Sequence, residues 1–327
     1  MKPQRVAEVL ESLFSTRWPP FLWGPPGVGK SSVVRAVAAK LGLPLIDLRA
    51  SLLDPTDLRG IPTVEGGQAR WCSPEFLPRG EASSGVLFLD ELNAAPPLVQ
   101  ASLYQLTLDR RIGEYQLPDG WRIAAAGNRS EDGSVTFRMP TALANRFVHL
   151  EFEADFEDWR AWTVDHDIHP WVVGFLSVRK ELLCSTQKAE RGFPTPRSWE
   201  MASDVLKTVG NHRNALDILV GTIGEAAAVE FGGYCDRAIS EGAILKILKD
   251  PETAALPDTL GDLYALISYI TFSARVAGVL EAAAVLLHRV KPEMAVLLLR
   301  NLLQKEPKFA LQKRTAEFMR RHKDLIR

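Results

Sequence analysis

Residues 24–31 constrain this chain more than any other stretch, because their sequence, GPPGVGKS, fits the phosphate-loop pattern G-x-x-x-x-G-K-[ST] at every defined position. Glycines let the backbone bend so that successive N–H groups point inward, and a following helix adds the positive end of its dipole. Residues 20–23 predict a short buried strand, and residues 32–41 carry apolar residues at helical spacing. The order strand, glycine loop, helix therefore predicts a nucleotide site.

Two side chains of this loop have specific predicted roles. Lys30 is expected to reach the β and γ phosphates as a cation, and the Ser31 hydroxyl to take one coordination position on Mg²⁺. A chance Gly/Pro turn before a helix is the alternative interpretation. The loop thus predicts a nucleotide and Mg²⁺ as ligands, and the other expected nucleotide contacts are Gly24, Pro25, Pro26, Gly27, Val28, Gly29 and Ser32.

Two adjacent carboxylates end a second apolar run. Residues 86–89 predict a strand that is buried on both faces, and Asp90 and Glu91 follow it directly. Ligands of open α/β sheets bind at such strand ends. We expect Asp90 to hold Mg²⁺ through its water shell and Glu91 to polarise the water that attacks the γ-phosphate. A solvated acidic strand end is the alternative.

Three further polar residues are candidates for catalysis. Asn128 ends the fourth predicted strand, where its amide would bond the γ-phosphate and the attacking water; a capping role is the alternative. Arg146 precedes the last strand and suits the site of a neighbouring subunit, in competition with Arg110 and Arg111 and with a surface ion pair. Arg197 opens a later helix and would reach the γ-phosphate across a cleft, unless it forms a helix-end ion pair.

The remaining pattern predicts a parallel α/β sheet followed by helices. Further strands are predicted at residues 43–48, 122–127 and 147–152, with a helix at 97–109. Turn signals at Gly66-Gly67 and at Pro118-Asp119-Gly120 predict two hairpin insertions, at 61–71 and 113–123. Beyond residue 154 the pattern is helical, and the Lys- and Arg-rich tail at 305–327 is expected to form a solvated amphipathic helix rather than a binding patch.

Length, charge and cysteine content narrow the class of protein. A chain of 327 residues exceeds one compact α/β domain, so two lobes are expected. The 39 Lys and Arg residues nearly balance the 40 Asp and Glu residues, which argues against a global nucleic-acid binder. Three scattered cysteines indicate neither a disulfide framework nor a zinc site, and no apolar run reaches membrane-spanning length. These features predict a cytoplasmic location without membrane contact.

The motifs, taken together, resemble those of AAA+ ATPases: Walker A at 24–31, Walker B at Asp90 and Glu91, sensor 1 at Asn128, an arginine finger at Arg146 and sensor 2 at Arg197. Residues 52–60, 89–97 and 143–147 are similar to the MoxR family, including its CbbQ/NorQ-like branch. Arg129 departs from that pattern, because many relatives have proline after the sensor asparagine.

The resemblance implies a five-stranded core in the order 5-1-4-3-2, an α-helical lid and a hexameric ring. It implies an AAA+ core at 1–153, whose first insertion faces the pore and whose second is the pre-sensor hairpin. A lid would follow at 154–250 and a C-terminal helical extension at 251–327. Members of the family act as chaperone-like remodelling ATPases, commonly with a partner that carries a von Willebrand factor A domain.

Three functions remain open from the sequence. The first is an ATP-hydrolysing ring motor whose inserts engage a client protein. The second is an AAA+ subunit of a nucleic-acid-processing complex, which the basic tail favours and the near-zero net charge disfavours. The third is an assembly switch that binds ATP but turns it over too slowly to be a motor.

Overall fold

The computed structural model describes residues 1–80, 83–132, 136–185 and 191–323. The chain divides into two compact units, Met1–Ala154 and Asp155–Arg327. Strands of the described residues all lie in the first unit, and the second unit is helical. Among the described residues, no helix combines the length and the apolar character that a membrane span requires.

A five-stranded, all-parallel sheet forms the centre of the first unit. Its strands lie in the order β2-β5-β8-β1-β9 and comprise β1 (Pro20–Trp23), β2 (Leu45–Arg49), β5 (Ser84–Asp90), β8 (Gly120–Gly127) and β9 (Val148–Glu151). In order of appearance within this sheet the strands are therefore arranged 2-3-4-1-5, which confirms the predicted α/β fold and its strand order. The carboxyl ends of β1, β5 and β8 are neighbours, and these three strand ends carry the predicted site.

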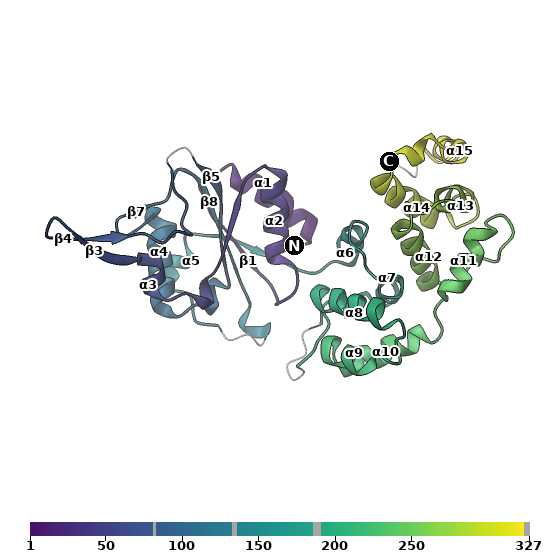
Figure 1. Ribbon diagram of the computed structural model, residues 1–327, viewed down its shortest axis with the longest axis horizontal. Coiled ribbons are helices and arrows are strands. Elements are labelled where there is room, and N and C mark those ends of the chain that lie inside the picture. The colour runs from purple at the N-terminus through teal and green to yellow at the C-terminus, as the bar shows by residue number, and fades with distance from the viewer. Residues whose placement is uncertain (81–82, 133–135, 186–190, 324–327) are drawn as a thin grey trace. The chain divides into compact units, whose positions relative to one another are not determined.

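Helices cover both faces of this sheet, because side chains along each buried strand alternate between the two faces. On one face Phe21, Leu87, Leu89 and Ile123 pack with Leu103 of α4. Helices α1 and α2 lie side by side on the opposite face (Figure 1). The helices of this unit are α1 (Pro3–Phe14), α2 (Lys30–Lys40), α3 (Pro55–Arg59), α4 (Pro97–Asp109) and α5 (Thr141–Ala144), with short 3₁₀ turns η1 (Ala50–Leu52), η2 (Leu92–Ala94) and η3 (Ser130–Asp132).

The first predicted insertion is an antiparallel hairpin of β3 (Ile61–Glu65) and β4 (Gln68–Cys72) that projects from the first unit (Figure 1). The second prediction was wrong in its position. The hairpin there is made by β6 (Arg111–Ile112) and β7 (Tyr115–Gln116), and it turns at residues 113–114. Residues 118–120 do form a turn, closed by a 3.0 Å bond from Trp121 N–H to Pro118 O, but this turn leads into β8.

The second unit is built around the packing of α7 (Pro170–Val178) on α12 (Leu260–Phe272). The two helices approach closely where Gly174 faces Gly261: a Cβ on Gly174 would lie 2.3 Å from the Tyr234 hydroxyl and 2.6 Å from the Gly261 carbonyl oxygen. The other helices are α6 (Phe156–Thr163), α8 (Pro196–Val209), α9 (Leu216–Ile223), α10 (Glu225–Cys235), α11 (Glu241–Lys249), α13 (Val279–Leu286), α14 (Pro292–Lys305) and α15 (Lys313–Arg321), with 3₁₀ turns η4 (Lys180–Leu183) and η5 (Pro307–Leu311).

The tail at 305–327, expected to form a solvated amphipathic helix, contains such a helix only at α15 (Lys313–Arg321) among its described residues. Helix α14 ends at Lys305, and Pro307 begins a 3₁₀ turn because proline cannot continue a helix. The basic helix α15 then packs back on the unit, with Phe318 buried. Residues 324–327 of the predicted tail and extension lie outside the described residues.

Candidate functional site

The phosphate loop of residues 24–31 connects β1 to α2. Gly29 caps α2 with a φ of 107°, a backbone conformation that residues other than glycine rarely adopt. The Lys30 ammonium donates to the carbonyl oxygens of Gly24 at 2.7 Å and of Pro25 at 2.9 Å. The loop thus curls around a buried cation at the N-terminus of a helix, an arrangement in which both the charge and the helix dipole would stabilise phosphate oxygens.

Ser31 and Asp90 provide two oxygen ligands side by side. The Ser31 hydroxyl donates to the Asp90 carboxylate at 2.7 Å, and Asp90 is the last residue of β5. Mg²⁺ prefers oxygen ligands and keeps several waters, so it is usually held by one or two protein groups together with nucleotide phosphates. The hydroxyl and carboxylate fit that requirement. Burial and the nearby Asp90 carboxylate raise the pKa of Asp47 on the neighbouring strand β2.

Glu91 follows Asp90 in a left-handed backbone conformation, with φ of 56° and ψ of 33°. A residue other than glycine pays a cost of about 1 kcal/mol for this conformation, which commonly marks functional sites. Its carboxylate accepts a hydrogen bond from the Ser51 hydroxyl, which belongs to η1 directly after β2. Ser51 was not predicted as a site residue. It is brought to Glu91 because β2 and β5 are adjacent parallel strands whose ends coincide at Arg49 and Asp90.

Asn128 directly follows β8, and its side-chain oxygen accepts from the Lys30 ammonium at 2.9 Å. The buried amide of Asn93 holds its backbone at two points. The Asn93 side chain donates to the Asn128 carbonyl at 2.7 Å and accepts from the Asn128 N–H at 3.2 Å. The structure therefore adds Asn93 to the predicted site as the residue that fixes Asn128. Its position two residues after Glu91 did not by itself indicate this role, because Asn128 lies 35 positions away.

Arg129 stands where the related pattern has proline, and it is tied down by acidic neighbours. Its guanidinium pairs with Asp132 at 3.2 Å and with Glu151 at 3.5 Å. Asp132 lies in η3 and Glu151 at the end of β9. The turn after Asn128 is therefore held by ion pairs to its own 3₁₀ segment and to the edge strand.

The candidate arginines of the first unit differ in their contacts. Among the described residues, nothing accepts a hydrogen bond from the buried Nε of Arg146, and no carboxylate pairs with its guanidinium. Arg110, in contrast, donates to the carbonyl oxygens of Pro118 at 2.7 Å and Trp121 at 2.9 Å, and burial lowers its pKa. Arg111 is exposed on β6. Within the described part of the subunit, neither Arg146 nor Arg111 pairs with a carboxylate, so these contacts set Arg110 apart but do not separate the other two candidates.

Arg197 belongs to the second unit. It is the second residue of α8 and is exposed, next to a capping box formed by Thr195 and Ser198. The Ser198 N–H donates to the Thr195 hydroxyl at 3.0 Å, and the Thr195 N–H donates to the Ser198 hydroxyl at 2.7 Å. The start of α8 is therefore well defined within its own unit.

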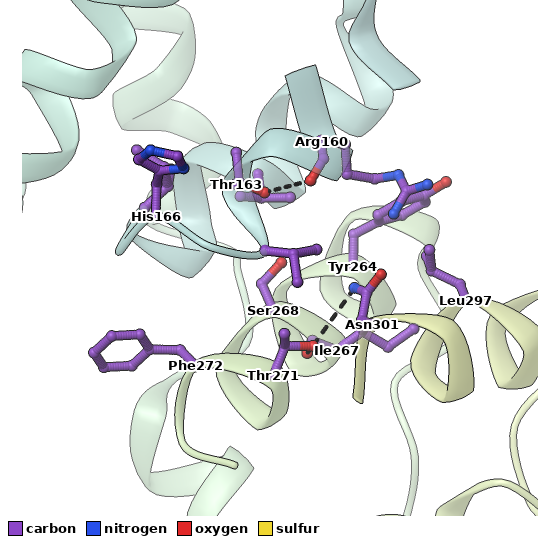
Figure 2. Close-up of a pocket in the computed structure, with 13 residues that line it drawn as sticks. Arg160, Thr163, His166, Tyr264, Ile267, Ser268, Thr271, Phe272, Leu297 and Asn301 are labelled. Atoms are coloured by element: carbon purple, nitrogen blue, oxygen red, sulfur yellow. Dashed lines mark hydrogen bonds between the residues drawn. The ribbon is translucent and has the colours of Figure 1, made fainter. Parts of the chain in front are cut away.

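The second unit also contains a pocket of about 400 Å³, including its open mouth, between α6, α12 and α14 (Figure 2). Asn301 donates to the Thr271 hydroxyl at 3.5 Å across it, and the Thr163 hydroxyl donates to the Arg160 carbonyl at 2.7 Å. Burial raises the pKa of Tyr264 on its wall. None of the residues predicted to bind nucleotide lines this pocket, so it is separate from the phosphate-loop site.

Part of this chain is similar to known proteins. Residues 19–147 match the family model of the AAA domain, dynein-related subfamily. The chain is 31% identical over 153 residues to the protein NorQ of Paracoccus denitrificans, covering 44% of this chain and 56% of NorQ. It is 29% identical over 154 residues to the denitrification regulatory protein NirQ of Pseudomonas aeruginosa, covering 45% of this chain and 58% of NirQ.

A eukaryotic relative matches as well. The chain is 30% identical over 196 residues to midasin of Giardia intestinalis, which covers 56% of this chain and 4% of midasin. The match thus spans little more than half the length of NorQ and NirQ and a small part of midasin. The region that matches the family model, residues 19–147, contains the phosphate loop, the acidic strand end and Asn128.

Proposed function

Because residues 19–147 match the model of the AAA domain, dynein-related subfamily, and the chain is similar to NorQ and NirQ, we propose that the protein hydrolyses ATP with Mg²⁺ as a ring-forming AAA+ ATPase of the MoxR type. In this proposal its turnover remodels or activates a partner protein. The proposal rests mainly on one observation: the carboxyl ends of β1, β5 and β8 lie next to one another. There the ammonium of Lys30 contacts Asn128, and the hydroxyl of Ser31 contacts Asp90.

Each of these groups has a distinct task in hydrolysis. Lys30 would exchange its carbonyl partners for the β and γ phosphates, with its charge stabilising their oxygens. Ser31 and Asp90 would hold Mg²⁺, which when bound neutralises charge that develops on the phosphates. Glu91, oriented by Ser51, would accept a hydrogen bond from the attacking water and polarise it. Asn128 would orient that water or the γ-phosphate.

We propose that Arg146 completes the site of a neighbouring subunit. An arginine that stabilises a neighbour's phosphate should not already pair with a carboxylate of its own chain. Arg146 meets this condition among the described residues. A ring, which the resemblance gives as hexameric, would bring each Arg146 to the next nucleotide. In the same proposal residues 154–250 act as a lid whose Arg197 senses the γ-phosphate, and residues 251–327 form an extension.

The β3–β4 hairpin is the proposed contact with a client or adaptor, such as a protein with a von Willebrand factor A domain. Strand alternation places Pro62, Val64, Ala69 and Trp71 on one of its faces. All four are exposed, Val64 by 77% and Trp71 by 41%. A two-stranded hairpin with an uncovered apolar face gains stability when a partner covers it.

The decisive experiment measures steady-state ATP hydrolysis with Mg²⁺ across a range of protein concentrations. The rate per chain should rise with concentration, Glu91→Gln and Arg146→Ala should each be inactive, and a mixture of the two variants should regain part of the activity. Arg111→Ala is the matched control and should remain active. A concentration-independent rate that survives Arg146→Ala would rule out shared sites.

The client contact can be tested with the ATP-locked Glu91→Gln chain. Proteins retained by it in the presence of ATP should be lost when Val64→Ser and Trp71→Ser are added, whereas Thr63→Ser on the other face should retain them. ATP hydrolysis by the hairpin variant in a wild-type background should stay unchanged. Equal retention by both hairpin variants would exclude this face as the contact.

A further inference from the structure

His149 bridges the start of the phosphate loop and the segment that carries Arg146. The Trp23 indole Nε1–H donates to Nδ1 of His149 at 2.8 Å, and Nε2 of the same ring lies 2.8 Å from the Ala144 carbonyl oxygen. Trp23 is the last residue of β1, immediately before Gly24, while Ala144 ends α5 two residues before Arg146. One imidazole thus connects the start of the phosphate loop, which serves the chain's own proposed nucleotide site, with the turn before Arg146, which is proposed to serve a neighbour's site.

Its two partners determine the tautomer of His149. The indole N–H of Trp23 is a donor only, so Nδ1 must accept; the carbonyl of Ala144 is an acceptor only, so Nε2 must carry the proton. The imidazole is therefore neutral when both bonds are made. The two rings are close to coplanar, with an interplanar angle of 25° and a centroid distance of 6.0 Å, as a hydrogen bond between their edges requires.

The contact at Ala144 lies on the turn that places Arg146. The Ala144 carbonyl also accepts from the Phe147 N–H at 3.2 Å, and the Arg146 N–H donates to Leu143 O at 3.0 Å. The His149 bond therefore adds a second donor to the carbonyl that closes this turn. At the other end, the Gly24 carbonyl next to Trp23 is a partner of the Lys30 ammonium.

We propose that His149 is a positioning residue that ties the turn bearing Arg146 to the strand end from which the phosphate loop begins. This inference rests on the proposed function, in which Arg146 acts on a neighbour's nucleotide. The bridge would orient the guanidinium offered to the neighbour without contacting nucleotide itself. Its loss should therefore weaken what a chain does for its neighbour while leaving its own nucleotide binding intact.

The test uses full-length chains in which donor and acceptor of the arginine are different molecules. Donor chains carry Glu91→Gln and keep Arg146; acceptor chains carry Arg146→Ala and keep Glu91. The reference mixture gives the restored ATP hydrolysis rate. Further donors add one of three changes. His149→Phe keeps a ring but makes neither bond, Trp23→Phe removes the indole donor with part of the ring, and His149→Gln brings an amide that both accepts and donates.

Donors with His149→Phe should restore roughly fivefold less activity than the reference, as expected for a lost hydrogen bond. Trp23→Phe should also lower the restored activity. Combining it with His149→Phe should lower that activity no further, because both changes remove the same bridge. His149→Gln should restore most of the rate. The affinity of each donor for a fluorescent ATP analogue, and ring size by light scattering, should match the reference donor.

Two results would overturn the inference while leaving the proposed function intact. One is an active reference mixture in which the His149→Phe donor restores the full rate. The other is a His149→Phe donor that loses ATP affinity together with rescue, because the damage would then lie in its own site. An inactive reference mixture would instead refute the shared site itself, and the positioning role with it.

Discussion

The ammonium of Lys30 lies 2.9 Å from the side-chain oxygen of Asn128, although 98 positions separate the two residues in the chain. The contact exists because β8 is the neighbour of β1 in the sheet, so that their carboxyl ends meet. Asn93 holds the backbone of Asn128 from the other side, which fixes the direction of its amide. The proposed phosphate-binding cation and the predicted sensor are thereby joined by a hydrogen bond.

Replacing Asn128 with alanine should lower kcat for ATP hydrolysis by roughly tenfold to a hundredfold. ATP affinity should change little, because Lys30, the proposed phosphate contact, is retained and Asn128 is only one of its three partners. Asn128→Asp should behave differently, since a carboxylate beside the ammonium competes with the phosphates and weakens ATP binding. Measured kcat and dissociation constants for the two variants separate these effects; an unchanged kcat in Asn128→Ala would contradict the sensor role.

Removing the Ser51 hydroxyl should lower kcat about fivefold without changing ATP affinity. Ser51 donates to the carboxylate of Glu91, and without that bond the proposed base loses the contact that orients it. Ser51→Thr keeps a hydroxyl and serves as the matched control, which should retain most of the rate. Single-turnover hydrolysis measures the chemical step directly, and equal rates for Ser51→Ala and wild type would show that Glu91 needs no such support.

Local patterns predicted the sheet and the phosphate loop, because the signals lie within a few residues of each other. Residues 24–31 and the acidic pair after residue 89 can each be recognised from a few consecutive residues. Ser51 and Asn93 could not be recognised in this way, since each acquires its role from a residue on another strand end. A serine just after β2 becomes informative only once β2 is placed beside β5.

Tertiary contacts also explain the misplaced hairpin. The Pro118-Asp119-Gly120 turn exists, but the Arg110 guanidinium holds it against the start of β8 through Pro118 O and Trp121 O. The Leu117 N–H donates to the Arg110 carbonyl at 2.8 Å and so closes the hairpin base earlier in the chain. Turn propensity identified where the chain bends, whereas strand pairing decided which bend closed a hairpin.

Gly174→Ala should destabilise the second unit by about 1–3 kcal/mol, because the added methyl group has no room between α7 and α12. The Tyr234 ring and the Gly261 backbone would have to move apart. Gly232→Ala on α10 is the control: open space surrounds that position, and alanine is the better helix former. Urea unfolding should show a lower midpoint for the first variant and an equal or higher one for the second; equal midpoints for Gly174→Ala and wild type would refute the tight crossing.

Acidification should destabilise the second unit through His169. Burial, with a smaller contribution from the Lys207 cation, lowers the pKa of His169 to about 4, while its Nδ1 accepts from the Trp171 N–H at the start of α7. In the unfolded chain a histidine titrates near 6.5, so below that pH the unfolded state binds the proton that the folded state excludes. The stabilisation is complete above pH 6.5 and falls by roughly 3 kcal/mol by pH 4, below which both states are protonated.

His169→Asn, which can cap the helix without titrating, should therefore lose less unfolding free energy than wild type between pH 6.5 and 4. Equal pH slopes for the two chains in urea unfolding would show that His169 is not held neutral.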